Sequence, residues 1–148
     1  LAGYWWAKKK KLSFLYLCDI FVVPLALGNA LGRLGNFFNG ELYGIPSNLP
    51  WAIKFPTTAV HVHPTQLYEV LYNLLIFGVL WHLKGKNLKR GYLLAVFLVL
   101  YSVFRFIIEF FKDQTHLGTT AGLSTGQWLT IPTFIIGALM LYSANRQP

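Results

Sequence analysis

Charged residues are scarce in this sequence, and acidic ones are the scarcest. Only 12% of the 148 residues are charged and five are Asp or Glu, whereas soluble domains carry roughly 25% charged residues. A chain with so little charge cannot cover the surface of a soluble fold. Its apolar share of 55% also excludes a disordered chain, because disordered segments are poor in apolar residues and rich in charge.

Cysteine is nearly absent as well. The single cysteine, Cys18, excludes an intramolecular disulfide framework and a zinc site built from cysteines. His61 and His63 lie two residues apart, but no cluster of carboxylates or cysteines accompanies them to complete a metal site. We therefore expect the chain to use neither a metal nor another cofactor.

Long apolar runs are what the sequence has in abundance. Most extend for about 17–21 residues, close to the roughly 20 that a helix needs to cross a bilayer. They predict an all-α fold, a polytopic transmembrane helical bundle with about four full spans and the end of another. The full spans are residues 12–31, 67–83, 91–111 and 128–142, and the partial one is residues 1–7.

The whole chain is interpreted as a single integral-membrane domain, residues 1–148. Residue 1 is leucine rather than methionine, and residues 1–7 have the composition of a span that begins earlier. We therefore expect this domain to be an N-terminally truncated part of a larger protein.

The basic residues predict which way the spans cross the membrane. Only Lys54 and Lys112 fall in loops on one side, whereas nine of the 13 fall on the other, which the positive-inside rule places in the cytoplasm. Residues 41–66 and 112–127 then form outward-facing loops. Short basic loops beside spans also argue against nucleic-acid binding, which requires a basic face on a soluble fold. The nine are Lys8, Lys9, Lys10, Lys11, Lys84, Lys86, Lys89, Arg90 and Arg146.

A polar segment follows the first full span. Arg33, Asn36 and Asn39 recur at spacings of three, so they share one helical face, and Glu41 adds a carboxylate. An ionisable group inside a membrane costs about 2.5–3.5 kcal/mol, so such groups usually mark function. The alternative is an interfacial cap in which Arg33 extends toward lipid phosphates.

Glycines are concentrated in the same segment. Gly28 and Gly32 form a small-xxx-small pair, which predicts the close approach of another helix. Gly44 ends the segment and permits a tight turn or the close approach of backbone to a ligand.

The span at residues 91–111 contains a second polar group. Tyr101, Arg105 and Glu109 are spaced i, i+4, i+8 and project from one stripe, so Arg105 and Glu109 are placed to pair. One interpretation is a structural ion pair between helices. The other is a guanidinium held for an anionic substrate, because the arginine fork makes two parallel hydrogen bonds to phosphate.

Residues 61–69 lead into the span at residues 67–83. Thr65, after Pro64, is the predicted N-cap of that helix, with Glu69 in its first turn. His63 or Glu69 is also placed to face the site. In the first full span, Asp19 is expected to bind a neighbouring helix or cap a break rather than to do chemistry.

These motifs together resemble the bacterial prolipoprotein diacylglyceryl transferase family. Residues 32–44, Gly-Arg-Leu-Gly-Asn-Phe-Phe-Asn-Gly-Glu-Leu-Tyr-Gly, are similar to the family signature. Residues 63–69, His-Pro-Thr-Gln-Leu-Tyr-Glu, resemble a second family stretch. Residues 101–109 resemble its late transmembrane motif, and residues 126–128 the start of its last span. The four motifs occur in the family's order along nearly the whole chain.

The resemblance implies a fold and a reaction. The family is an inner-membrane helical protein of about seven spans, and this chain resembles its C-terminal portion. The family transfers the diacylglyceryl group of phosphatidylglycerol to the lipobox cysteine thiol of bacterial prolipoproteins and releases glycerol phosphate. The implied partners are phosphatidylglycerol, the prolipoprotein signal peptide and the lipid bilayer of the bacterial cytoplasmic membrane.

The resemblance also implies roles for individual residues. The family's candidate base lies in an earlier His-Gly-Gly segment that has no counterpart in these residues, and His63 is the nearest candidate here. The matching essential residues are Arg33, Asn36, Glu41, Gly44 and Arg105, and the family's late tyrosine and glutamate fall on Tyr101 and Glu109.

The chemistry of these side chains suits a phosphate ester. We expect Arg33, Asn36 and Arg105 to hold the phosphate, because guanidinium groups stabilise the charge that develops on a leaving phosphate. Glu41 and Glu109 are expected to orient those groups, and Tyr101 to bond the headgroup. The expected catalytic set is Arg33, Glu41, Tyr101, Arg105 and Glu109, and the expected substrate-binding set is Arg33, Asn36, Asn39, Gly44, His63 and Arg105.

A membrane transporter or channel is the alternative from another functional class. Arg105 and Glu109 would then be residues of the transport pathway. This interpretation predicts inverted repeats or interrupted, paired spans, and neither is evident in the sequence.

Overall fold

The regular secondary structure of the described residues is almost entirely helical, which confirms the predicted fold class. The computed structural model describes residues 2–112, 119–120 and 122–146. Three helical segments of this part, Phe14–Phe38, Tyr92–Phe111 and Thr125–Ala144, are long and apolar enough to cross a membrane. The elements are α1 (Ala2–Lys9), α2 (Phe14–Phe38), α3 (Thr65–Leu83), α4 (Tyr92–Ile108), the 3₁₀ helix η1 (Glu109–Phe111), β1 (Thr119–Thr120), β2 (Leu123–Ser124) and α5 (Thr125–Arg146).

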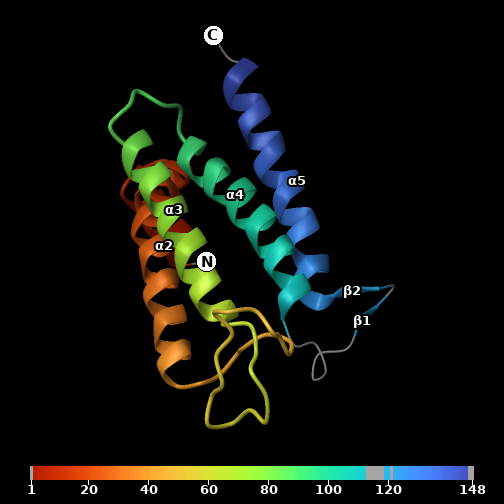
Figure 1. The fold of residues 1–148 in the computed structure, drawn as a ribbon. Coiled ribbons are helices and arrows are strands. Elements are labelled where there is room, and N and C mark those ends of the chain that lie inside the picture. The colour runs from red at the N-terminus through yellow and green to blue at the C-terminus, as the bar shows by residue number, and fades with distance from the viewer. Residues whose placement is uncertain (1, 113–118, 121, 147–148) are drawn as a thin grey trace.

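Two helix pairs make up the bundle. α2 lies along α3, α4 lies along α5, and α4 also contacts both α2 and α3 (Figure 1). The loop between α2 and α3 lies at the lower end in that view, and the α3–α4 loop lies at the other end. The apolar core between α2, α3 and α4 consists of Val22, Val23, Ala26, Tyr72, Ile76, Leu80, Leu93 and Phe97.

The first full span is a longer helix than the apolar run predicts. α2 does not end near residue 31 but continues to Phe38, through Arg33 and Asn36 of the polar segment. It also contains Pro24 within its length. Arg33 and Asn36 are consequently held on a rigid helix rather than on a loop.

The expected role of two α2 glycines is wrong for the part of the chain that the structure describes. A Cβ atom added at Gly28 or Gly32 would meet nothing within 4 Å, so no described helix packs closely there. The close helix approach occurs instead at Gly137 in α5, where an added Cβ would lie 2.9 Å from the Cβ of Leu98 in α4. The small size of Gly137, rather than a pair of glycines, permits this close contact between the helices.

α3 forms where a span is expected but differs from the other long helices. It is not among the three segments apolar enough to cross a membrane. Gln66, Glu69 and Asn73 lower its hydropathy, and all three side chains are buried inside the bundle. Their spacing of three and four residues places them on one face of the helix, which is therefore a polar face turned inward.

The beginnings of two helices differ from the prediction. Thr65 is the first residue of α3 rather than its N-cap, and its hydroxyl donates to the Leu42 carbonyl oxygen at 3.1 Å. α5 begins at Thr125, earlier than residue 128. There the Ser124 Oγ accepts from the Gln127 N–H (3.1 Å), and the Gln127 Oε1 accepts from the Ser124 N–H (3.0 Å). This reciprocal capping box explains the earlier start.

Asp19 links α2 to the first turn of α4. Binding a neighbouring helix was one of the two roles expected for this residue. Its carboxylate accepts hydrogen bonds from the backbone N–H groups of Gly91 (2.5 Å) and Leu94 (2.8 Å). These are groups that the start of a helix leaves without intrahelical partners. Gly91 has a φ of 88°, a left-handed conformation that glycine adopts without strain.

Replacing Asp19 should loosen this junction. We expect Asp19→Ala to lower the free energy of unfolding by about 2 kcal/mol, because hydrogen bonds to a charged group contribute about 1.5–3 kcal/mol. Asp19→Asn retains one acceptor oxygen and should lose less. Thermal unfolding in detergent measures both variants, and an unchanged midpoint for Asp19→Ala would contradict the anchoring role.

Candidate active site

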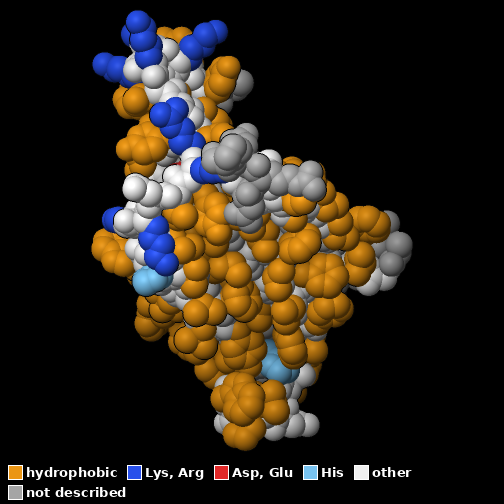
Figure 2. All heavy atoms as spheres, turned by 90° about the horizontal axis from the view of Figure 1, so that it is seen from above, with side chains coloured by type: hydrophobic (Ala, Val, Ile, Leu, Met, Phe, Trp, Pro, Cys, Tyr) orange, Lys and Arg blue, Asp and Glu red, His pale blue; other side chains and the backbone are white. Residues whose placement is uncertain are grey.

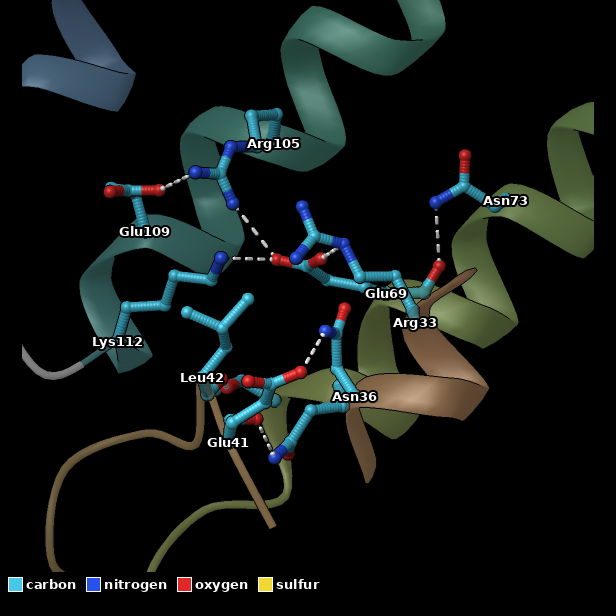
Figure 3. Close-up of polar contacts among 11 residues, drawn as sticks. Arg33, Asn36, Glu41, Leu42, Glu69, Asn73, Arg105, Glu109 and Lys112 are labelled. Carbon is cyan, nitrogen blue, oxygen red and sulfur yellow. Dashed lines mark hydrogen bonds and ion pairs between the residues drawn. The ribbon is translucent and has the colours of Figure 1, made fainter. Parts of the chain in front are cut away.

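A buried carboxylate lies at the centre of the polar end of the bundle. Glu69, in the second turn of α3, is 1% exposed and forms ion pairs with three cations that come from three different elements (Figure 3). Its Oε2 pairs with the Arg33 Nε of α2. Its Oε1 lies 2.8 Å from the Arg105 Nη1 of α4 and 2.6 Å from the Lys112 Nζ, just after η1.

A second carboxylate holds Arg105 from the other side. The Glu109 Oε2 lies 3.0 Å from the Arg105 Nη2, which confirms that these two residues pair. Glu109 is 2% exposed and packs against the first turn of α5, where a Cβ added at Gly126 would lie 2.7 Å from its Oε1. The Arg105 guanidinium is thus fixed between carboxylates on α3 and η1. We call Arg33, Glu69, Arg105, Glu109 and Lys112 the ion cluster.

The ion cluster has more positive than negative charge. Its formal sum is three cations against two carboxylates, in a region where the side chains of Arg105 and Lys112 are only 18% and 13% exposed. Burial lowers the pKa of Lys112, although the neighbouring Glu69 carboxylate acts to raise it. Electrostatic interactions are stronger away from bulk water, so the cluster favours an added anion.

The pairing of Arg33 decides between its two interpretations. As an interfacial cap, its guanidinium would extend outward toward lipid phosphates. In the structure its side chain is 25% exposed and pairs with the buried Glu69 carboxylate inside the bundle. The interfacial cap is therefore wrong, and Arg33 belongs to the ion cluster.

A second polar group lies beside the ion cluster and involves the end of α2. The Glu41 Oε1 accepts hydrogen bonds from the side-chain amides of Asn36 (2.7 Å) and Asn39 (3.4 Å). The backbone carbonyl of Glu41 accepts one from the Gln66 side chain at 2.6 Å. Glu41 therefore positions the two asparagines, whereas Glu69 positions Arg33.

Several buried polar atoms near the ion cluster have no hydrogen-bond partner among the described residues. They include the Gln66 Oε1, the Tyr72 hydroxyl and the Asn73 Oδ1 on α3. Buried polar groups are normally paired, so unpaired ones on the face that includes Glu69 are consistent with a ligand that has polar groups of its own.

Tyr101 and His63 are held at the edges of the site. The Tyr101 ring stacks on Phe97 and meets Tyr72 edge to face, with centroids 5.4 and 6.1 Å apart. The Nδ1 of His63 lies 3.1 Å from the Tyr68 hydroxyl, and the His63 ring packs against Phe111. When that hydroxyl donates to Nδ1, the neutral imidazole keeps its proton on Nε2.

Gly44 has a packing role that its sequence motif does not reveal. Its N–H donates to the His63 carbonyl oxygen at 2.9 Å, and it pairs with Lys112 in an isolated antiparallel bridge. A Cβ added there would lie 2.2 Å from the Phe111 carbonyl oxygen and 2.7 Å from the Thr65 Cγ2. Only glycine lets the two segments meet, and this meeting places Lys112 against Glu69.

Sequence reasoning identified most of this site but missed its centre. Glu69 was expected first as part of a helix start, and Lys112 was counted as an outer-loop charge. The signal for Glu69 was the polar stripe with Gln66 and Asn73 in an otherwise apolar helix. Nothing in the sequence distinguished Lys112 from Lys54, which is exposed. Within the described ranges, no group of three His, Cys, Asp or Glu side chains is placed to hold a metal ion.

Comparisons with known proteins point to one family. The family described as prolipoprotein diacylglyceryl transferase matches residues 1–143. Proteins named phosphatidylglycerol–prolipoprotein diacylglyceryl transferase from Idiomarina loihiensis and Bordetella avium are 45% and 43% identical, over 99% and 96% of this chain. One from Geobacter sulfurreducens is 41% identical over 99% of it. The chain covers 56%, 57% and 58% of these relatives, so it spans little more than half their length.

Substitutions at Gly44 and Gly35 should show whether Gly44 is needed for close packing or only for backbone flexibility. We expect Gly44→Ala to destabilise the protein by about 2 kcal/mol or more, because backbone atoms surround the added methyl group. Gly35→Ala adds a methyl group where nothing lies within 4 Å, so it should leave the unfolding midpoint unchanged or raise it. Thermal unfolding of both variants tests this, and equal midpoints would contradict the packing role of Gly44.

Proposed function

Because the chain belongs to the prolipoprotein diacylglyceryl transferase family, we propose that it supplies the phosphate-binding part of such an enzyme. The whole enzyme would move the diacylglyceryl group of phosphatidylglycerol onto the lipobox cysteine thiol of a prolipoprotein, the first step of lipoprotein maturation. The observation that carries the proposal is the ion cluster, in which three partly buried cations converge on Glu69 and exceed the carboxylates by one.

The reaction needs this kind of charge distribution. The thiolate sulfur attacks the glycerol carbon that bears the phosphate, a C–S bond forms, and the C–O bond breaks. The phosphate changes from a diester with one negative charge to a glycerol phosphate with up to two, and the thiol proton passes to a base. Arg33, Arg105 and Lys112 stabilise the charge that develops on the leaving phosphate.

The carboxylates act by fixing the cations in position. Glu69 holds Arg33, Arg105 and Lys112, and Glu109 holds the other face of Arg105. Donors that are already oriented need no rearrangement as charge develops, which is the main advantage of a preorganised site. Glu41 has the same effect on Asn36 and Asn39.

The headgroup hydroxyls have candidate partners next to the phosphate. The unpaired oxygens of Gln66 and Asn73 accept hydrogen bonds from the glycerol hydroxyls, and the Tyr72 hydroxyl donates or accepts. Tyr101 contacts Tyr72 and lies one helical turn before Arg105, where it lines the same end of the site. Gly44 and His63 contribute through the segment that positions Lys112.

The site lies in the outer half of the bacterial cytoplasmic membrane in this proposal. The ion cluster is at the end of the bundle opposite the α3–α4 loop, which contains four of the nine basic residues predicted to face the cytoplasm. The prolipoprotein signal peptide and the lipid then reach the cluster from the outer leaflet, beside residues 41–66 and Lys112; residues 113–118 and 121 of the second predicted outer loop lie outside the described residues.

Removing either arginine should abolish transfer. We expect Arg33→Ala and Arg105→Ala each to lower the rate at least about 100-fold, the cost of removing one preorganised donor. The assay incubates membranes containing the full-length enzyme with phosphatidylglycerol and a lipobox peptide, and mass spectrometry detects the diacylglyceryl thioether. Lys54→Ala, which removes an exposed cation at the same end, is the matched control.

Two outcomes of that assay would contradict the proposal. Full transfer by either arginine variant would exclude the phosphate-binding role. Absence of thioether from the wild-type enzyme, together with Arg105-dependent flux of ions or solutes in vesicles, would favour the transporter.

Neutralising Glu69 should separate binding from catalysis. Glu69→Gln keeps the side-chain volume but leaves three cations without their common carboxylate, so we expect kcat to fall at least about 100-fold as donor orientation is lost. The extra positive charge should leave the KM for phosphatidylglycerol unchanged or lower. A purely structural role predicts the opposite, namely a lower yield of folded enzyme whose kcat is normal.

A further inference from the structure

A cavity lies at the end of the bundle opposite the ion cluster. It has a volume of about 620 Å³, and it lies between the first half of α2, the last turns of α3 and the start of α4. Along α3, the 15 residues from Glu69 to Lys84 span about 22 Å at 1.5 Å per residue. A bilayer has a hydrocarbon core of about 30 Å, so the two sites face opposite leaflets.

Its volume of about 620 Å³ is large enough for a lipid headgroup and the first part of its chains. We call this space the basic cavity, because Lys84, Lys86, Lys89 and Arg90 lie along its rim. Figure 2, which views the molecule from this end, shows Lys and Arg side chains along one side of a largely hydrophobic surface.

The one acidic residue among the described lining residues is hydrogen-bonded to the backbone. Asp19 directs its carboxylate oxygens to the backbone N–H groups of Gly91 and Leu94. Among the described residues, its carboxylate forms no ion pair with Lys84, Lys86 or Arg90. The rim accordingly presents a concentrated positive charge to a ligand.

The wall below the rim is apolar. Ile20, Leu27 and Phe77 line it, and Trp81 lies near the level of the cations, with the Lys84 Nζ 3.7 Å from its ring centroid. Tryptophan prefers the boundary between headgroups and hydrocarbon. A ligand that fits both parts has a negative headgroup beside an apolar tail.

We propose that the basic cavity binds an anionic phospholipid of the cytoplasmic leaflet, with its phosphate at Lys84, Lys86 and Arg90 and its acyl chains along Ile20, Leu27 and Phe77. Basic pockets between membrane helices on the cytoplasmic side have the charge and shape that such lipids require. The proposal requires insertion in a membrane but not transferase activity. The lipid bound here lies far from the ion cluster and is not consumed.

The test counts bound lipids by native mass spectrometry of the full-length protein in neutral detergent. The variant is Lys84→Gln/Lys86→Gln/Arg90→Gln. The matched control, Lys8→Gln/Lys9→Gln/Lys10→Gln, removes the same charge from the same end of the bundle but from residues that do not line the cavity. The probes are dioctanoyl phosphatidylglycerol, dioctanoyl phosphatidylcholine and inorganic phosphate.

We expect the wild-type protein to bind one more phosphatidylglycerol than the cavity variant. Each basic residue near an anionic surface strengthens binding roughly fivefold, so three substitutions should weaken this binding about 100-fold. The control should stay within about twofold of wild type. Phosphatidylcholine should not fill the cavity, and millimolar inorganic phosphate should not displace the lipid.

Three results would overturn the proposal. They are equal phosphatidylglycerol binding by the cavity variant, an equal loss in the control, and displacement by inorganic phosphate alone, which would indicate a site for free anions. The cavity variant should also retain diacylglyceryl transfer at saturating phosphatidylglycerol. Failure of the transferase assay in the wild-type enzyme would leave this lipid count unaffected, so the two proposals fail separately.

Discussion

The structure of the polar end depends on one buried carboxylate that attracts three cations. Glu69 contributes no apolar surface, and its desolvation is offset only while Arg33, Arg105 and Lys112 stay beside it. Each cation belongs to a different segment, so their shared partner determines how the ends of α2, α3, α4 and η1 meet. Buried ion pairs are weak evidence for stability, which makes positioning the better explanation of this cluster.

The surrounding packing keeps these groups at contact distance. Gly44 lets the segment after α2 lie against Phe111, and the resulting bridge holds Lys112 near Glu69. Gly126 lets α5 begin directly against the Glu109 carboxylate. At both positions a single methyl group would fall within 3 Å of an oxygen that belongs to the site or its support. Backbone contact, rather than further side-chain bonds, therefore sets the precision of the charged groups.

The two ends of the bundle use positive charge in different ways. At the polar end the cations are partly buried and held by buried carboxylates, which suits a site where charge must be stabilised as it develops. At the other end Lys84, Lys86 and Arg90 surround an open, apolar-walled cavity whose acidic residue, Asp19, is occupied by backbone groups. That arrangement suits reversible attraction of an anion that carries a hydrocarbon tail.

The helical class, most of the spans and the faces of single helices could be predicted from the amino-acid sequence. Apolar runs and the spacing of Tyr101, Arg105 and Glu109 were sufficient, because helical periodicity places such residues on one stripe. The packing of the helices was needed to show that Glu69 is the centre of the ion cluster and that Lys112 belongs to it, since the two lie 43 residues apart. Helical periodicity shows which residues share a face of one helix. Which faces contact each other depends on the packing between helices, and periodicity contains no information about it.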